Sequence, residues 1–325
     1  MNKVINSLLA AAVIVAAPAA YAADAYPTKP LTVIVPFAAG GPTDTVARLI
    51  AQAMTADLKQ QVTVENVGGA GGTLGAGRVA RAAPDGYTLL VHHIGQATAP
   101  SLYRKLPYKA DDDFAPVGLI TDVPMTIVAR KDFPAKDVTE LLAYLKANKD
   151  KVTYANAGVG SASHLCGMLF MSALDTQLTT VPYKGTGPAM NDLLGGQVDL
   201  MCDQTTNTTS QIKTGAIKAY AVTTKTPVAS LPTLPTLDKS GLPGFEVAVW
   251  HGMYAPKGTP APVIEKLNAA LKVAMQDPMV KQRLADLSSD IPPMDKISPA
   301  GLKTHLEAEI AKWGPVIKKA GIYAD

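Results

Sequence analysis

Hydrophobic residues along the chain recur at two different spacings, and each spacing predicts a different secondary structure. Residues 31–35, Leu-Thr-Val-Ile-Val, form a short β-branched run that predicts a strand. After Gly40-Gly41-Pro42, apolar side chains recur at helical spacing from Val46 to Met54. Further strands are predicted at residues 62–64 and 87–91. This first part of the chain therefore predicts strands that alternate with helices.

The middle of the chain repeats this alternation. Asp137, followed three residues later by Glu140, has the pattern of a helix start. Strands are predicted at residues 152–154, 179–181, 198–201 and 219–222. A proline-rich connection follows at residues 227–244, and then an extended apolar stretch at residues 245–254. Three helices are predicted after it, at residues 262–275, 279–287 and 299–320. The alternation predicts an α/β protein in which helices cover parallel sheets.

The first residues have the pattern of a secretory signal peptide. A single positive charge at Lys3 precedes an apolar run from Leu8 to Ala17, and Ala20-Tyr21-Ala22 has the small residues of a cleavage site. We therefore expect residues 1–22 to be removed and the mature protein to be periplasmic; a retained membrane anchor is the alternative. The apolar run is shorter than the ~20 residues that a transmembrane helix needs, and no later segment of the sequence supplies such a run.

Charge and cysteine content narrow the function and the compartment. The net charge is only +3 and the sequence contains no basic stripe, so we expect no nucleic-acid partner. The two cysteines are Cys166 and Cys202. Disulfides persist in the compartments of exported proteins, so a single disulfide and a pair of buried thiols both remain open.

Three glycine-rich loops each lie between a predicted strand and a predicted helix. They span residues 37–44, 156–164 and 183–188, and they contain the hydroxyl side chains of Thr43, Ser161, Ser163 and Thr186. Unpaired N–H groups at a helix start attract anions, and glycine lets a ligand approach the backbone. Each loop by itself is also explained as an ordinary turn with a helix cap. Three together favour one shared site, because loops at the carboxyl ends of strands converge on one crevice.

Sequence motifs of enzymes do not match. The glycines of residues 69–75 miss the G-x-G-x-x-G spacing, and neither a P-loop, an H-E-x-x-H nor a G-x-S-x-G motif occurs. His92-His93 lacks the ligand spacing of a metal site. The serines and histidine of Ser161–His164 are explained by a ligand-binding loop as well as by catalysis, and Asp44 suits a first helical turn. We expect no enzyme activity, cofactor or metal.

Seven segments of the chain, in the same order, resemble the substrate-binding receptors of the tripartite tricarboxylate transporter group, also called Bug receptors. These segments are Pro36–Asp44 with Ala47-Arg48, Gly71–Gly75, Ala83–Leu90, Leu102–Tyr108, Pro182–Gly185, Asp192–Asp199 and Gly241–Glu246. Each segment alone is a weak signal. Together they cover essentially the whole chain after the predicted signal peptide, which makes the resemblance specific.

The resemblance implies a two-domain, type II-like periplasmic binding protein fold, in which each domain is a mixed sheet flanked by helices. Domain 1 would comprise residues 24–124 plus 248–325, and domain 2 residues 125–247. Two connecting strands would act as a hinge beside the ligand cleft. Such a receptor is expected to be a monomer that hands a small carboxylate to membrane permease subunits. A receptor for a signalling system, or an exported enzyme acting on a carboxylic acid, are the alternatives.

The resemblance also implies ligand-binding residues on both sides of the cleft. Together with residues that follow predicted strands, the expected set is Phe37, Gly41, Pro42, Thr43, Asp44, His92, His93, Ser161, Ser163, His164, Tyr183, Thr186 and Asp203. Family members often carry small polar residues where this chain has His92-His93, so an unusual specificity is expected. The predicted ligand is a dicarboxylate, either aliphatic or an aromatic acid of the terephthalate type that stacks on these histidines.

Overall fold

One long strand, β4 (Phe114–Arg130), connects two parts of a mixed sheet. Its first part pairs with β9 (Ala248–Pro256), and its second part pairs with β7 (Leu200–Gln204) and β8 (Ile217–Val222). The strand order is β2-β1-β3-β9-β4-β7-β5-β6, and β8 pairs with β4. The remaining strands are β1 (Leu31–Val35), β2 (Val62–Asn66), β3 (Thr88–His93), β5 (Thr153–Asn156) and β6 (Thr179–Pro182).

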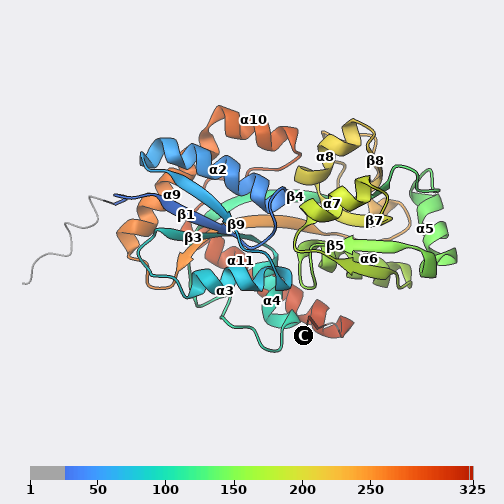
Figure 1. Ribbon diagram of the computed structural model, residues 1–325, viewed down its shortest axis with the longest axis horizontal. Helices are drawn as coiled ribbons and strands as arrows, with labels where there is room; N and C mark the ends of the chain where they lie inside the picture. The colour runs from blue at the N-terminus through green and yellow to red at the C-terminus, as the bar shows by residue number, and fades with distance from the viewer. Residues whose placement is uncertain (1–25, 322, 325) are drawn as a thin grey trace, which may run out of the picture.

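The computed structural model describes residues 26–321, 323 and 324, and the signal peptide predicted for residues 1–22 lies outside this range. Figure 1 shows two lobes side by side, with β4 and β9 running between them. The first lobe contains β1, β2, β3 and the helices α2 (Pro42–Leu58), α3 (Thr73–Ala80), α4 (Gly95–Leu102), α9 (Ala261–Gln276), α10 (Pro278–Asp286) and α11 (Pro299–Ala320). The second lobe contains β5 to β8 and the helices α5 (Val138–Ala147), α6 (Ala162–Leu174), α7 (Thr186–Leu194) and α8 (Thr205–Lys213).

Strand direction follows from the way the chain passes between the lobes. Within the first lobe β1 is parallel to β2 and β3, and within the second lobe β5 is parallel to β6 and β7. The prediction of parallel strands is confirmed for these pairs. Strands β4 and β9 are antiparallel, because one strand enters the second lobe and the other returns from it, so the mixed sheet implied by the resemblance is confirmed.

The apolar periodicity of the sequence builds the layer between the sheet and its helices. Val33 of β1 is fully buried, and Val46, Ile50 and Met54 of α2 are buried in the same apolar cluster. The helical spacing puts these side chains on one face of α2, so that this face covers the sheet. Helix α2 is thereby held with its first turn at the carboxyl end of β1, where the first glycine-rich loop lies.

A disulfide joins two elements of the second lobe. Cys166 of α6 is bonded to Cys202 of β7, with a Cα–Cα distance of 6.1 Å. Both residues are fully buried. Of the two alternatives that the sequence left open, the structure contains the disulfide, which links the helix covalently to the neighbouring strand. The bond lies just behind the loop that begins α6 and the end of β7, and both of these contribute to the site described below.

Several elements have no counterpart in the sequence prediction. The periodicity predicted neither β4 nor the helices α4 and α8, whereas α7 is the helix expected after the third glycine-rich loop. The sheet changes its pairing partner within β4 between Pro124 and Met125, but the expected domain boundaries near residues 124 and 247 stay a prediction. Among the residues that the structure describes, none of the helices combines the length and apolar character needed to cross a membrane.

Candidate functional site

Loops from both lobes enclose a small pocket at the boundary between them. The pocket has a volume of ≈ 20 Å³, which is room for about one water molecule. It is lined by Phe37, Gly41, Pro42, Thr43, His93, Ala157, Ala162, Ser163, Thr186, Asp203 and Gln204. The structure therefore brings together eight of the thirteen residues that the sequence singled out, and it adds Gln204 as a polar neighbour.

The first-lobe wall is the start of helix α2. Gly41 is the N-cap residue in extended conformation and its helix start has no side-chain cap, while Pro42 occupies the first turn. Proline suits this position because its missing N–H is one that the helix leaves unpaired in any case. The amides of the following residues stand at the positive end of a 17-residue helix, and Thr43 adds a hydroxyl group. This wall is suited to an anion.

Asp44 supports this wall and does not line the pocket. One of its carboxylate oxygens accepts hydrogen bonds from Arg48 and from the Gly40 N–H, and the other accepts one from Asn66, at 3.0, 3.0 and 2.9 Å. Burial opposes ionisation, but these hydrogen bonds outweigh it and lower the pKa of Asp44 below its ordinary value. The ionised carboxylate of Asp44 therefore stabilises the conformation of the loop.

The second-lobe wall includes the start of α6. Ser161 caps this helix and accepts a hydrogen bond from the His164 N–H, and its hydroxyl is 3.1 Å from that of Ser163. The Ser163 hydroxyl accepts the Ala157 N–H and lines the pocket. His164 lies on another face of the helix and lines a separate outer pocket; burial lowers its pKa to about 4. Ser163 is thus the polar side chain that this loop contributes to the candidate site, beside Ala157 and Ala162.

The rest of the second-lobe wall comes from α7 and β7. Asp203 is fully buried at the end of β7 and accepts hydrogen bonds from Asn207 and the Gln204 N–H. Burial raises its pKa to about 7, although these bonds and one from Thr186 oppose the rise. The side-chain amide oxygen of Gln204, Oε1, is buried without a hydrogen-bond partner, and this residue lines the pocket. This wall therefore offers hydrogen-bonding groups without a cation.

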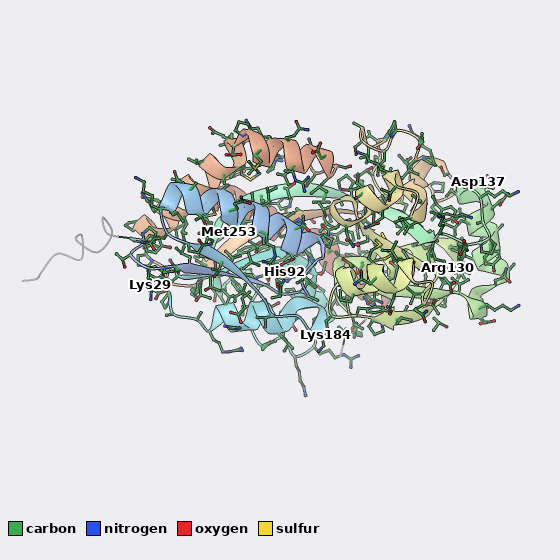
Figure 2. All side chains as sticks on the ribbon, turned by 45° about the horizontal axis from the view of Figure 1, so that its top comes forward. Lys29, His92, Arg130, Asp137, Lys184 and Met253 are labelled. Atoms are coloured by element: carbon green, nitrogen blue, oxygen red, sulfur yellow. A yellow bond between two sulfur atoms is a disulfide. The ribbon has the colours of Figure 1, made fainter. Side chains whose placement is uncertain are left out.

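Tyr183 has a different position from the one expected. Its hydroxyl donates to Asp192 at 2.6 Å, and it does not line the pocket. Burial and this bond raise its pKa to about 12. Its neighbour Lys184 lies near the boundary between the lobes in Figure 2 and is exposed; its carbonyl oxygen accepts the Ala38 N–H from the first lobe at 2.9 Å.

A group of aromatic rings lies in and behind the first-lobe wall, and two of them, Phe37 and His93, line the pocket. Phe37 stacks on His93 at a centroid distance of 4.6 Å and meets His92 edge-on at 5.7 Å. His251 of β9 pairs in register with His93, and its ring lies 6.0 Å away. Burial lowers the pKa of His93 to about 3 and holds those of His92 and His251 well below their ordinary value, so all three are neutral. Sequence reasoning missed His251.

The lobes touch on several sides of the pocket. The Tyr103 hydroxyl lies 2.6 Å from the Ala70 carbonyl oxygen and 2.7 Å from that of Val159 in the second lobe. On another side, the Ser288 carbonyl oxygen accepts a hydrogen bond from Thr205 at 3.2 Å. Since the enclosed volume holds about one water molecule, a larger ligand enters only if these contacts separate.

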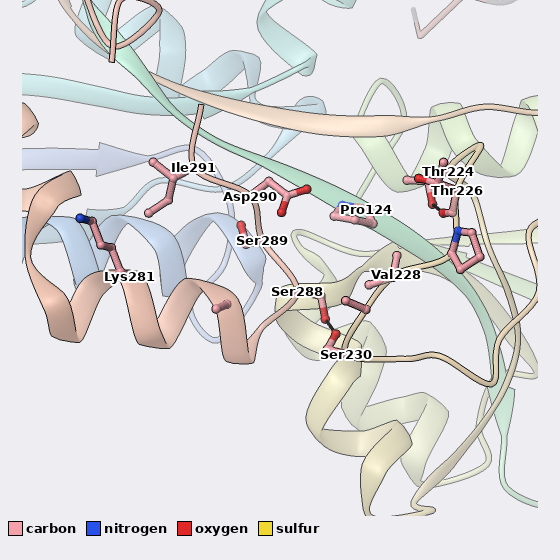
Figure 3. Close-up of a pocket in the computed structure, with 13 residues that line it drawn as sticks. Pro124, Thr224, Thr226, Val228, Ser230, Lys281, Ser288, Ser289, Asp290 and Ile291 are labelled. Carbon is pink, nitrogen blue, oxygen red and sulfur yellow. Dashed lines mark hydrogen bonds between the residues drawn. The ribbon is translucent and has the colours of Figure 1, made fainter. Parts of the chain in front are cut away.

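A larger pocket of ≈ 570 Å³ lies beside β4, and Figure 3 shows the residues that line it. Ser230 of the second lobe faces Ser288 of the first lobe there, and Asp290 and Pro124 lie farther along its wall. Asp290 is exposed, and none of the three glycine-rich loops contributes to this pocket. Within the described part of the chain, no group of three or more histidine, cysteine, aspartate or glutamate residues is placed to hold a metal ion.

Comparison with known proteins agrees with this geometry. Residues 46–322 match the model of the tripartite tricarboxylate transporter family receptors, TctC. A structure described as the periplasmic binding protein BugD is 53% identical with a TM-score of 0.90, and the match covers 92% of this chain and 99% of that one.

Two further solved structures are similar along nearly their whole length. MatC from Rhodopseudomonas palustris, with bound malate, is 45% identical with a TM-score of 0.87, covering 90% of this chain and 100% of that one. Another R. palustris protein, with adipate, is 34% identical with a TM-score of 0.86, covering 92% of this chain and 99% of that one. The chain therefore belongs to the tripartite tricarboxylate transporter receptor family, a family of periplasmic solute-binding receptors.

Proposed function

We propose that this receptor captures a small aliphatic dicarboxylate between its two lobes and, as a periplasmic monomer, delivers it to the permease subunits of a tripartite tricarboxylate-type transporter. One observation carries the proposal. The uncapped start of α2 at Gly41–Thr43 faces Ser163 and Thr186 of the second lobe across a single enclosed pocket. A ligand with an acceptor at each end would contact both lobes at once and so stabilise their closed arrangement.

The charge of the pocket favours carboxylates. None of the residues that line it is an arginine or a lysine, so an anion would be stabilised by the helix start, by hydroxyl groups and by neutral histidine. Hydrogen bonds and dipoles of this kind are sufficient for a carboxylate. A multiply charged phosphate would lack a cationic partner and would lie near Asp203.

The arrangement of the aromatic residues favours an aliphatic ligand over an aromatic one. His92 and His93 already contact Phe37 and each other, with the two imidazole centroids 4.9 Å apart. The imidazole rings are therefore already partly covered by other rings of the protein, which leaves less of their surface for an aromatic ligand to stack on. The similar structures with malate and adipate contain aliphatic dicarboxylates, which supports the same preference.

A ligand panel tests the proposal. Malate, succinate, adipate, terephthalate, inorganic phosphate and glucose are added to the mature protein, and thermal unfolding and calorimetry are measured. A ligand at about a hundred times its Kd contributes about 2.7 kcal/mol to the native state, which corresponds to a rise in Tm on the order of 5 °C. We expect this rise with at least one aliphatic dicarboxylate. Binding of glucose without a response to any acid would reject the proposal, and a response to terephthalate alone would reject the aliphatic preference.

A further inference from the structure

We propose that His251 is a positioning residue for the ligand: it donates its Nε2–H to the Thr43 hydroxyl oxygen and thereby leaves the Thr43 hydroxyl hydrogen free to donate into the pocket. The proposal rests on the carboxylate function proposed above and deepens it. It explains how one wall of the pocket would distinguish a hydrogen-bond acceptor from a hydrogen-bond donor.

The contact is between residues that are far apart in the sequence. The Nε2 atom of His251 lies 3.2 Å from the Thr43 hydroxyl oxygen, and the two residues are separated by 208 positions. Thr43 lines the pocket, whereas His251 is fully buried behind it on β9. His251 therefore acts on the pocket through the threonine and not by direct contact.

The second ring nitrogen of His251 decides which of two arrangements is favoured. Its Nδ1 atom is buried and has no hydrogen-bond partner. If Thr43 donated to Nε2, the proton would be on Nδ1, which would leave a buried N–H without an acceptor. If Nε2–H donates to Thr43, Nδ1 is only an unpaired acceptor. Orphaned buried N–H groups are rare in folded proteins, so the second arrangement is favoured.

The neighbouring histidines follow the same pattern. The His92 Nδ1 atom accepts the His93 N–H, and the His93 Nδ1 atom accepts the Gly95 N–H, each at 2.9 Å. A neutral imidazole with Nδ1 as acceptor carries its hydrogen on Nε2. The imidazoles of His92, His93 and His251 are therefore all assigned the same tautomer, with the hydrogen on Nε2.

The consequence is a directional hydroxyl group. A hydroxyl has one hydrogen and accepts at its oxygen. When His251 occupies an acceptor position of Thr43, the remaining hydrogen is available to a carboxylate oxygen of the ligand. Without His251, the hydroxyl can rotate, and its contribution to binding an acceptor decreases.

The tautomer is measured directly, without any ligand. Nitrogen-15 NMR of the imidazole groups is recorded for the wild type and for His251→Gln, whose missing signals identify His251. We expect a protonated Nε2 and an unprotonated Nδ1. A proton on Nδ1 would overturn the proposal whatever the protein binds, so this result is independent of the ligand panel.

Calorimetry with malate and adipate tests the effect on binding. His251→Phe keeps a planar ring but loses the donor, and we expect it to weaken binding about tenfold. His251→Gln retains an N–H near the Nε2 position and should recover most of this loss. His305→Gln, on α11 beside Trp250, is the matched control and should bind as the wild type does.

A double substitution distinguishes a role of His251 in orienting the Thr43 hydroxyl from a role in filling space behind it. Thr43→Val combined with His251→Phe should bind no more weakly than Thr43→Val alone, because both changes remove the same hydrogen bond. Wild-type affinity in His251→Phe, or additive losses in the double variant, would refute the proposal. If the wild type binds none of malate, succinate and adipate, the proposed function fails on the ligand panel, while the NMR result still decides the tautomer.

Discussion

Gly187, the second residue of α7, provides a direct test of closure between the lobes. An added Cβ at this position would lie 2.7 Å from the carbonyl oxygen of Ala39, which is a first-lobe atom, and 3.0 Å from the carbonyl carbon of Gly40. Its backbone is not in the left-handed region, so alanine is compatible with the helix itself. Gly187→Ala therefore places its steric conflict between the lobes.

The size of the effect follows from the geometry. The difference between 2.7 Å and an ordinary contact of 3.4 Å is about 0.7 Å, and the clash is with backbone atoms. If the lobes separate by this distance to relieve the clash, the contacts that hold them closed become weaker. One of these contacts is the hydrogen bond from the Ala38 N–H to the Lys184 carbonyl oxygen. Overpacking of this kind destabilises a closely packed structure by about 1–3 kcal/mol, and here it would destabilise the closed arrangement of the lobes. We expect a Kd that is roughly 5- to 150-fold weaker.

The assay compares binding with stability in the same samples. Calorimetry with the dicarboxylate that stabilises the wild type most gives Kd, and thermal unfolding without ligand gives the stability of the lobes. Gly187→Ala should weaken binding without lowering the unliganded Tm, because alanine is the better helix residue. Gly195→Ala at the other end of α7 is the matched control, since the contacts within 3.4–4.0 Å of its added Cβ are with its own segment. Equal affinity in both variants would refute closure by these loops.

Three other predictions concern the second lobe and the compartment. Replacing Cys166 and Cys202 by serine opens a loop with a sequence separation of 36 and should lower the free energy of unfolding by about 4 kcal/mol in urea titrations; an unchanged midpoint would contradict this. The raised pKa of Asp203, about 7, means that its contribution to stability is greatest at low pH and is lost as the pH rises to 7. Asp203→Asn should therefore flatten the decline in unfolding free energy between about pH 4 and 7, and equal slopes would argue against it. Mass spectrometry of the periplasmic protein should show a mature chain that begins after Ala22, and a start before residue 20 would refute the signal-peptide prediction.

Local patterns in the sequence were enough to locate much of the site. Glycine-rich loops between a strand and a helix identify helix starts, and helix starts favour anions whatever the rest of the fold does. This reasoning selected Gly41, Thr43, Ser163 and Thr186, all of which line the pocket. The sequence also identified the two cysteines as a possible disulfide pair but left open whether they are bonded.

Patterns within a segment did not determine where each side chain points. Asp44, Ser161 and His164 belong to the expected loops, yet Asp44 braces its own loop, Ser161 caps α6 and His164 lies in an outer pocket. Adjacent residues on a helix point in different directions. Their part in ligand binding stays a prediction, because the spacing of residues alone does not distinguish a cap from a ligand contact.

The sequence by itself determined the composition of the loops, the alternation of strands and helices, and the family resemblance. Only the tertiary structure decided which distant residues meet. The crossing strands β4 and β9 bring His251 behind Thr43, and β7 brings Asp203 and Gln204 to the opposite wall. The physical reason is that local periodicity reflects which face of an element is buried. A pocket between two lobes depends instead on contacts between segments as much as two hundred residues apart.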